Sequence, residues 1–227
     1  MKFIEEPSPN FDIRGRDVDM VILHYTGMPT GGEALDRLRD EAAKVSAHYF
    51  IEENGDCYRL VAEDMRAWHA GVSAWKGEYD INARSIGIEI VNPGHEFGYR
   101  DFPEAQIGAV IALLKDIRTR HDIAPANVLA HSDVAPRRKE DPGEKFPWGR
   151  LAAEGIAVAS FEGDAKTDEA VSYDDALKAL GQIGYDAPPG DHAAALLAFQ
   201  RRFCPESLGQ GFDRRTKAAL ALLARAD

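Results

Sequence analysis

The stretch VDMVILHY (residues 18–25) is an apolar run that ends at a histidine and a tyrosine. Its length and its aliphatic side chains predict a buried β-strand. A second strand is expected at residues 85–91 (SIGIEIV), where isoleucines on one face alternate with a glycine and Glu89 on the other. A third and shorter strand is expected at residues 127–131, and it also ends at a histidine, His131. These three runs predict strands of one sheet.

Helical patterns lie between the strand-like runs. The clearest is residues 103–121, where apolar residues form one stripe and proline occupies the first turn. Another helix is expected at about residues 33–44. The dipeptide Asn54-Gly55 joins two further strands, residues 46–53 and 56–61, and predicts a hairpin. The sequence therefore predicts an α/β fold with a mixed central sheet flanked by helices.

The chain of 227 residues is long enough for one domain, or for one domain and a small second one. Residues 161–167 are polar and are expected to form a linker between a domain over residues 1–160 and a smaller one over residues 168–227. The second part contains helical patterns separated by glycine and proline, and these predict a three-helix bundle. The three helices are expected at residues 173–180, 193–203 and 214–225.

Composition excludes several classes of protein. The formal net charge is −11, so nucleic acid and anionic membranes would repel the chain. No apolar stretch of about 18 residues predicts a membrane span. Cys57 and Cys204 are too few for a disulfide scaffold or a CxxC motif and are expected to be small buried hydrophobes. Residues 1–10 lack the apolar run of a secretory signal, so we expect a cytoplasmic protein, or a periplasmic one if an export signal was removed.

Two histidines and one aspartate are candidate metal ligands. His24 and His131 both end apolar strand-like runs, and strand ends of such a sheet meet along one edge. Asp141 follows His131 by ten residues, a loop long enough to fold back and bring a third ligand. Two histidines and one carboxylate suit zinc with an open fourth position. A single histidine at a strand end is more often structural, so spacing alone leaves both interpretations open.

Four other residues are candidates for catalysis or substrate binding, and each also has a structural interpretation. Glu89 lies in a strand interior, where glutamate is disfavoured, so it is either a general base or a residue of a solvated face or salt bridge. Lys139 ends a run of three basic residues that by itself predicts a solvated patch. Trp68 and His69 lie in an aromatic loop, which suits the binding of sugar or peptide but also the anchoring of the loop by a buried tryptophan.

Five segments occur in an order and at intervals that resemble the type-2 zinc amidase family, the AmpD/AmiD-like N-acetylmuramoyl-L-alanine amidases. More distantly, they are similar to peptidoglycan recognition proteins. The resemblance spans about residues 8–150. The segments are VILHYTG (21–27), VSAHYFIEENG (45–55), RAWHAGVSAW (66–75), NARSIGIEIVN (82–92) and LAHSDVAPRRKEDPG (129–143).

The resemblance implies a role for each candidate. It implies that His24, His131 and Asp141 hold Zn²⁺, that Glu89 is the catalytic carboxylate and that Lys139 is the catalytic lysine. The substrate-side residues are expected to be His48, Trp68 and His69, which lie in the shared motifs.

The C-terminal part resembles the three-helix peptidoglycan-binding domain over about residues 168–227. The segments that carry this resemblance are AAALLAFQRRFCP (193–205) and GFDRRTKAALALL (211–223). Their aromatic and leucine residues are expected to form a core rather than to contact a ligand. The positions that match the domain's pattern are Phe199, Gln200, Phe203 and Thr216.

The implied activity is hydrolysis of the amide between N-acetylmuramic acid, or its 1,6-anhydro form, and the L-alanine of the stem peptide. The partners are then peptidoglycan or muropeptide fragments, and the role is cell-wall recycling in a bacterium. Three alternatives remain: a non-catalytic peptidoglycan recognition module, an exported amidase that remodels the wall, and a peptidase that cuts within the stem. Sequence patterns leave the oligomeric state open.

Overall fold

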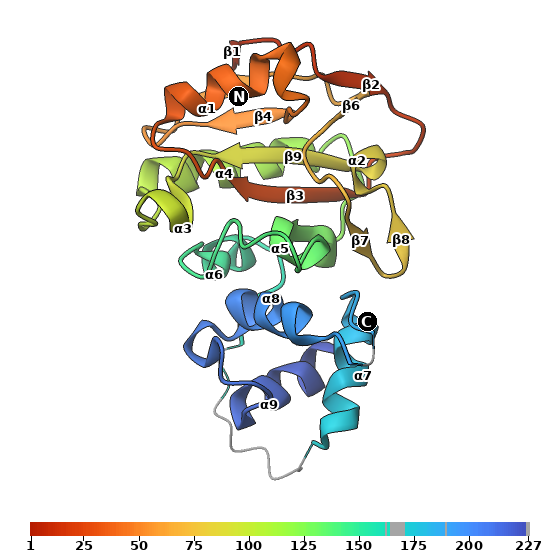
Figure 1. Ribbon diagram of the computed structural model, residues 1–227. Coiled ribbons are helices and arrows are strands. Elements are labelled where there is room, and N and C mark those ends of the chain that lie inside the picture. Colours follow the sequence, from red (N-terminus) through yellow and green to blue (C-terminus); the bar gives the residue numbers. More distant parts are fainter. Residues whose placement is uncertain (162, 164–170, 189, 226–227) are drawn as a thin grey trace.

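The computed structural model describes residues 1–161, 163, 171–188 and 190–225. Its centre is a six-stranded sheet in the order β1-β5-β4-β9-β3-β10 (Figure 1). All neighbouring strands run parallel except the β4–β5 hairpin, so the sheet is mixed, as expected. The strands are β1 (Ile4–Glu5), β3 (Met20–Tyr25), β4 (Tyr49–Ile51), β5 (Cys57–Arg59), β9 (Ser85–Ile90) and β10 (Val128–Ala130).

Two small ribbons and a series of helices surround this sheet. The ribbons are β2 (Phe11–Ile13) with β6 (Met65–Ala67), and β7 (Ala74–Trp75) with β8 (Glu78–Tyr79). The α-helices are α1 (Gly31–Arg39), α2 (Ile81–Arg84), α3 (Gly94–Phe97), α4 (Glu104–Ile117), α5 (His131–Val134), α6 (Trp148–Ala153), α7 (Tyr173–Ile183), α8 (Ala193–Phe203) and α9 (Arg214–Leu223). Short 3-10 helices occupy η1 (Glu41–Ala43), η2 (Pro125–Asn127) and η3 (Pro205–Ser207). Across the described ranges, no helix is long and apolar enough to cross a membrane.

The helix expected at residues 33–44 is shorter in the structure. The helix α1 ends at Arg39, and the side chain of Asp40 accepts a hydrogen bond from the backbone of Ala42 and starts the 3-10 turn η1. An aspartate that bonds nearby backbone in this way competes with a continuous helix.

Alternation along β3 and β9 gives the sheet two different faces. On one face, Val21 and Leu23 lie beside Ile86 and Ile88 and pack against α4, which lies behind the sheet in Figure 1. The other face carries His24 and Glu89, which are register partners on β3 and β9. One face therefore buries aliphatic core, and the opposite face presents polar groups at the carboxyl end of the strands.

The polar face is enclosed on two sides. The helix α1 packs Ala34 and Leu38 against Phe50, which pairs in register with Glu89. On the other side lie α5 and the loop that follows it, after β10 (Figure 1). The site candidates therefore lie between α1 and the segment after β10.

The helices α7, α8 and α9 form a unit beyond α5 and α6 (Figure 1). Its core is continuous with that of the sheet, because Met20, Ile22 and Leu129 belong to the same buried cluster as Leu180 and Phe199. The linker expected over residues 161–167 lies largely outside the described residues. Since the two parts share one core, their division into two domains stays a prediction.

A buried ion pair joins the helical unit to the rest of the chain. The Nε atom of Arg202 on α8 lies 3.5 Å from Oδ2 of Asp133 on α5, and both side chains are almost fully buried. Tyr185 donates a hydrogen bond of 2.6 Å to the other carboxylate oxygen of Asp133. The guanidinium also lies 3.6 Å from the ring centre of Trp148 and donates to the carbonyl of Val128. These contacts offset part of the cost of burying the charges.

We expect Asp133→Asn to destabilise the whole chain, because the amide leaves the Arg202 charge buried without its partner. Loss of one partner from a buried pair typically costs about 3–5 kcal/mol of the free energy of unfolding. Urea denaturation followed by circular dichroism measures this cost. The control is Asp186→Asn, which removes the exposed ion pair with Arg137 and should cost no more than ~1 kcal/mol. Equal effects of the two substitutions would contradict the assignment.

Candidate active site

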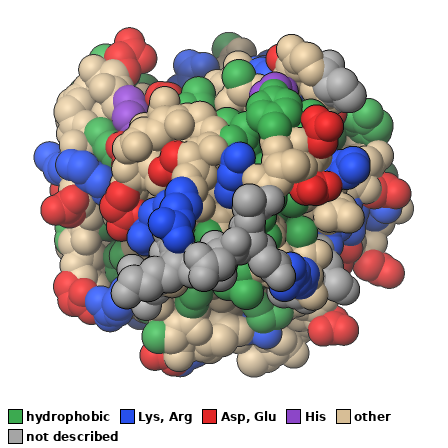
Figure 2. Space-filling view, turned by 90° about the horizontal axis from the view of Figure 1, so that it is seen from below, with side chains coloured by type: hydrophobic (Ala, Val, Ile, Leu, Met, Phe, Trp, Pro, Cys, Tyr) green, Lys and Arg blue, Asp and Glu red, His purple; other side chains and the backbone are tan. Residues whose placement is uncertain are grey.

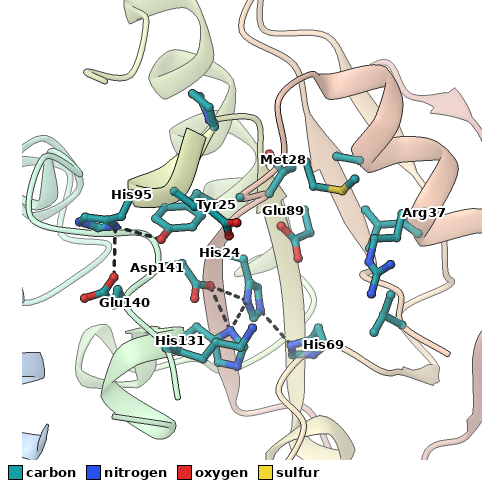
Figure 3. A pocket seen from close by; sticks show the side chains of 18 of the residues that line it. His24, Tyr25, Met28, Arg37, His69, Glu89, His95, His131, Glu140 and Asp141 are labelled. Carbon is teal, nitrogen blue, oxygen red and sulfur yellow. Dashed lines mark hydrogen bonds and ion pairs between the residues drawn. The ribbon is translucent and has the colours of Figure 1, made fainter. Parts of the chain in front are cut away.

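A cleft of about 350 Å³ opens on the polar face of the sheet, at the carboxyl ends of β3 and β9. His24 and Glu89 reach it from the strands, and Arg37 reaches it from α1 (Figure 3). His131 and Asp141 reach it from α5 and the loop after α5. The topology therefore brings together residues that are more than a hundred positions apart in the chain.

His24, His131 and Asp141 form a compact buried triplet. Nδ1 of His24 lies 2.9 Å from Nδ1 of His131 and 3.1 Å from Oδ2 of Asp141. Nδ1 of His131 lies 3.0 Å from the same carboxylate oxygen. Burial and the neighbouring His131 lower the pKa of His24 to about 4. Burial raises the pKa of Asp141, but the facing His131 and His24 outweigh it and hold that pKa below its ordinary value.

The outer nitrogen of each histidine has a polar partner. Nε2 of His131 lies 3.1 Å from the carbonyl oxygen of Ala70, which can only accept a hydrogen bond. Nε2 of His24 lies 3.1 Å from Nδ1 of His69. With the proton on each Nε2, both Nδ1 atoms point lone pairs at the Asp141 carboxylate. Three electron-rich atoms that face one another need a cation between them. Histidines that bind a metal through one ring nitrogen commonly donate a hydrogen bond from the other nitrogen, as His131 does to Ala70.

The donor set and its dimensions fit zinc. Ligand atoms at 2.0–2.1 Å from a tetrahedral zinc ion lie about 3.3 Å from one another. The three atoms here are separated by 2.9–3.1 Å, so a small adjustment of side chains accommodates the ion. Among the residues that the structure describes, His24, His131 and Asp141 are the cluster of histidine and carboxylate side chains close enough together to hold a metal ion.

Glu89 lies in the same cleft and next to His24 in the strand register. Its Oε2 atom is buried and has no hydrogen-bond partner within the described part of the chain. Burial raises the pKa of Glu89 to about 8, the Asp141 charge adds to this rise, and Lys139 opposes it. A buried carboxylate with a free oxygen and a raised pKa is suited to proton transfer near neutral pH.

Lys139 also lines the cleft, two residues before Asp141. Its backbone is held by a hydrogen bond to the carbonyl of Ala135. The preceding residue, Arg138, donates to the carbonyls of Ala70 and Val72 and so fixes the start of this loop. Lys139 thus brings a positive charge to a cleft whose other charged groups include several carboxylates.

The expected substrate-side residues separate into two groups. Trp68 and His69 line the cleft. His48 does not: its side chain is 0% exposed, its Nδ1 accepts from the backbone of Gly87, and its Nε2 lies 3.1 Å from the carbonyl of Met65. This burial argues against the expected contact of His48 with substrate and indicates that its side chain joins β9 to the start of β6.

Two other side chains of the cleft received no role from the sequence. Arg37 and His95 both line it (Figure 3). Arg37 borders the buried stripe of α1 that contains Ala34 and Leu38, so helical periodicity could have placed it at the edge of that stripe. His95 lies in a short helix after β9 and carries no pattern that distinguishes it. The two cysteines, as expected, are buried and unpaired.

A mixed sheet with a His–His–Asp triplet and a buried carboxylate beside it defines the class of metal-dependent hydrolases. A family model described as N-acetylmuramoyl-L-alanine amidase matches residues 14–144, and the chain belongs to this family.

Relatives and solved structures agree with this family. N-acetylmuramoyl-L-alanine amidase AmiD of Escherichia coli K12 is 36% identical over 230 residues, which cover 91% of this chain and 82% of AmiD. The 1,6-anhydro-N-acetylmuramyl-L-alanine amidase AmpD of Citrobacter freundii is 35% identical and covers 65% of this chain and 87% of its own. Among structures, E. coli AmiD in complex with anhydro-N-acetylmuramic acid-L-Ala-D-gamma-Glu-L-Lys has a TM-score of 0.82 at 35% identity, covering 92% of this chain and 89% of that one. AmpDh3 of Pseudomonas aeruginosa also has a TM-score of 0.82 at 35% identity and covers 92% of both chains.

We expect the wild-type chain to bind one zinc ion and His131→Ala to lose it at micromolar metal. Two remaining ligands cannot make the three-ligand site that holds zinc. Equilibrium dialysis followed by elemental analysis measures the occupancy. Glu89→Gln is the matched control, since it changes the same cleft without removing a ligand and should keep full zinc. Full occupancy in His131→Ala would refute the ligand assignment.

Proposed function

We propose that this chain is a zinc-dependent amidase that hydrolyses the bond between the lactyl group of N-acetylmuramic acid, or its 1,6-anhydro form, and L-alanine. The observation that carries the proposal is the buried Glu89 carboxylate beside the His24, His131 and Asp141 triplet. Two similar structures support the substrate class, AmiD with an anhydromuramyl peptide and AmpDh3 with an anhydromuramic pentapeptide. Zinc held by the triplet would polarise the scissile carbonyl and make water more acidic.

Glu89 is the general base. Its carboxylate accepts a proton from the attacking water and then delivers that proton to the amine of L-alanine as the amide C–N bond breaks. The raised pKa of Glu89 suits both proton transfers, because the carboxylate must first take a proton from water and then give it to the leaving amine. The cleft has room for this transfer, since the sheet face around Glu89 is open to the cavity.

Lys139 stabilises the negative charge that develops on the carbonyl oxygen. Its ammonium group lies in the cleft and close enough to Glu89 to lower the pKa of that carboxyl. A positive group that faces the developing oxyanion lowers the barrier, and its removal typically costs on the order of 10²–10³ in rate. Trp68 and His69 line the wall of the same cleft, which supports the proposal that they contact the substrate.

The helical unit is proposed to bind peptidoglycan. Phe199 and Gln200 are fully buried, and Gln200 bonds the hydroxyl of Thr216, so these positions are core. Any binding surface must therefore use exposed side chains such as Tyr173 and Leu222. Figure 2 shows that basic, acidic and apolar side chains are interspersed on this end of the molecule, as suits a largely uncharged glycan. Sedimentation of the Glu89→Gln protein with insoluble sacculi tests this binding.

The proposed role is recycling of muropeptides in the cytoplasm, where the substrate is a soluble fragment. An exported enzyme would instead meet intact wall. Parallel digestion of purified 1,6-anhydro-muropeptide and of sacculi separates the two substrate pools. Fractionation of cells that express the chain then locates the activity, and activity in the periplasmic fraction would overturn the cytoplasmic assignment.

We expect Glu89→Gln to keep zinc and fold but to lose about 10²–10⁴ in kcat, because proton transfer by a positioned side chain contributes that much. Mass spectrometry of a digested anhydro-muropeptide gives the rate and the products. The wild-type chain should release a peptide that begins with L-alanine. Products cut within the stem would identify a peptidase, and no products from a zinc-loaded chain would identify a recognition module. A loss below tenfold would point to another base.

A further inference from the structure

Arg201 on α8 reaches from the helical unit to the loop that carries the catalytic lysine and a metal ligand. Its Nη2 atom lies 3.0 Å from Oε1 of Glu140, and its Nε atom lies 3.4 Å from Oε2 of Glu144. The arginine side chain is only 10% exposed, whereas that of Glu140 is 52% exposed. Arg201 is therefore fixed by the packing of its helix, and its contact holds in one position a Glu140 side chain that would otherwise move in solvent.

Glu140 is the single residue between Lys139 and Asp141. The backbone on either side of it is held by other contacts: Lys139 bonds the carbonyl of Ala135, and the carbonyl of Asp141 accepts from the backbone of Ser132. Within the residues that the structure describes, the ion pairs of the Glu140 carboxylate are those with Arg201 and, at 3.7 Å, with His95.

The same contacts continue to the other side of the triplet. Nε2 of His95 lies 3.1 Å from Oε2 of Glu144, and its Nδ1 lies 2.9 Å from the hydroxyl of Tyr25 (Figure 3). Tyr25 directly follows the ligand His24 on β3. Arg201 thus closes a chain of polar contacts that connects the residue after one ligand with the residue before another.

We propose that Arg201 is a positioning residue for the amide hydrolysis, which acts through Glu140 to set the direction of the Lys139 side chain. The inference rests on the proposed amidase function. Without the guanidinium, the Glu140 and Glu144 carboxylates repel each other, and the Glu140 side chain turns outward while the backbone at Lys139 and Asp141 keeps its hydrogen bonds. The three ligands keep their own contacts, so the metal stays bound while the lysine leaves its place near the reacting carbonyl.

The experiment compares Arg201→Gln with wild type on purified anhydro-muropeptide. We expect kcat to fall about tenfold, less than the roughly 10²-fold cost of a 1 Å misplacement, with KM within about twofold and one zinc per chain. Arg201→Lys keeps the charge and should recover most of kcat. The matched control is Arg215→Gln, because Arg215 pairs with Glu206 inside the helical unit and should leave kcat unchanged.

A double-variant cycle separates positioning from a general loss of stability. Glu140→Gln lies at the exposed end of the pair and should lower kcat to the same extent as Arg201→Gln, and the double variant should be no slower than either single one. This arm also serves if Arg201→Gln does not fold. An unchanged kcat in either single variant, or losses that multiply in the double variant, would overturn the proposal. An inactive wild-type chain would instead refute the amidase function itself.

Discussion

The register between β3 and β9 is the constraint on which the site depends. Pairing of His24 with Glu89 puts a candidate metal ligand and a carboxylate side by side on one face of the sheet. A slip by one residue would turn one of them into the aliphatic layer under α4. The register is held because the opposite face of both strands is buried among isoleucine, valine and leucine side chains. Chemistry on one face is thus positioned by apolar packing on the other.

The three candidate ligands, His24, His131 and Asp141, meet because strand order brings β3 next to β10, and α5 begins where β10 ends. His131 is the first residue of α5, and the carboxylate of Asp133 accepts a hydrogen bond from the backbone of Ala130 at this turn. Asp133 is also the partner of the buried Arg202 on α8. The turn that presents His131 is therefore the same turn that anchors the helical unit, and the two parts share this ion pair as well as a core.

Much of this arrangement could be predicted from local patterns. The strand run around His24, the alternation around Glu89 and the Asn54-Gly55 hairpin are each encoded within a few residues, and the structure has these elements. The strand expected at residues 127–131 is shorter, because β10 ends at Ala130 and His131 begins α5. Motif resemblance added Lys139, whose local run is only a basic patch. Contacts between distant segments were not predictable in this way. The burial of His48 depends on its packing between Met65 and Gly87, and no periodicity in its own strand indicates that.

The same reasoning explains why the helical tail was predicted as a separate bundle. Its pattern of glycine and proline breaks shows where helices end, but it does not show which of their faces remain apolar after the bundle forms. In the structure α8 turns Phe199 toward its own bundle and toward the cluster that contains Ile22 and Leu129. Two consecutive arginines on α8 then serve different purposes, since Arg202 is buried against Asp133 and Arg201 reaches Glu140. Adjacent residues of one helix thereby connect the helical unit to the turn that begins with His131 and to the loop before Asp141.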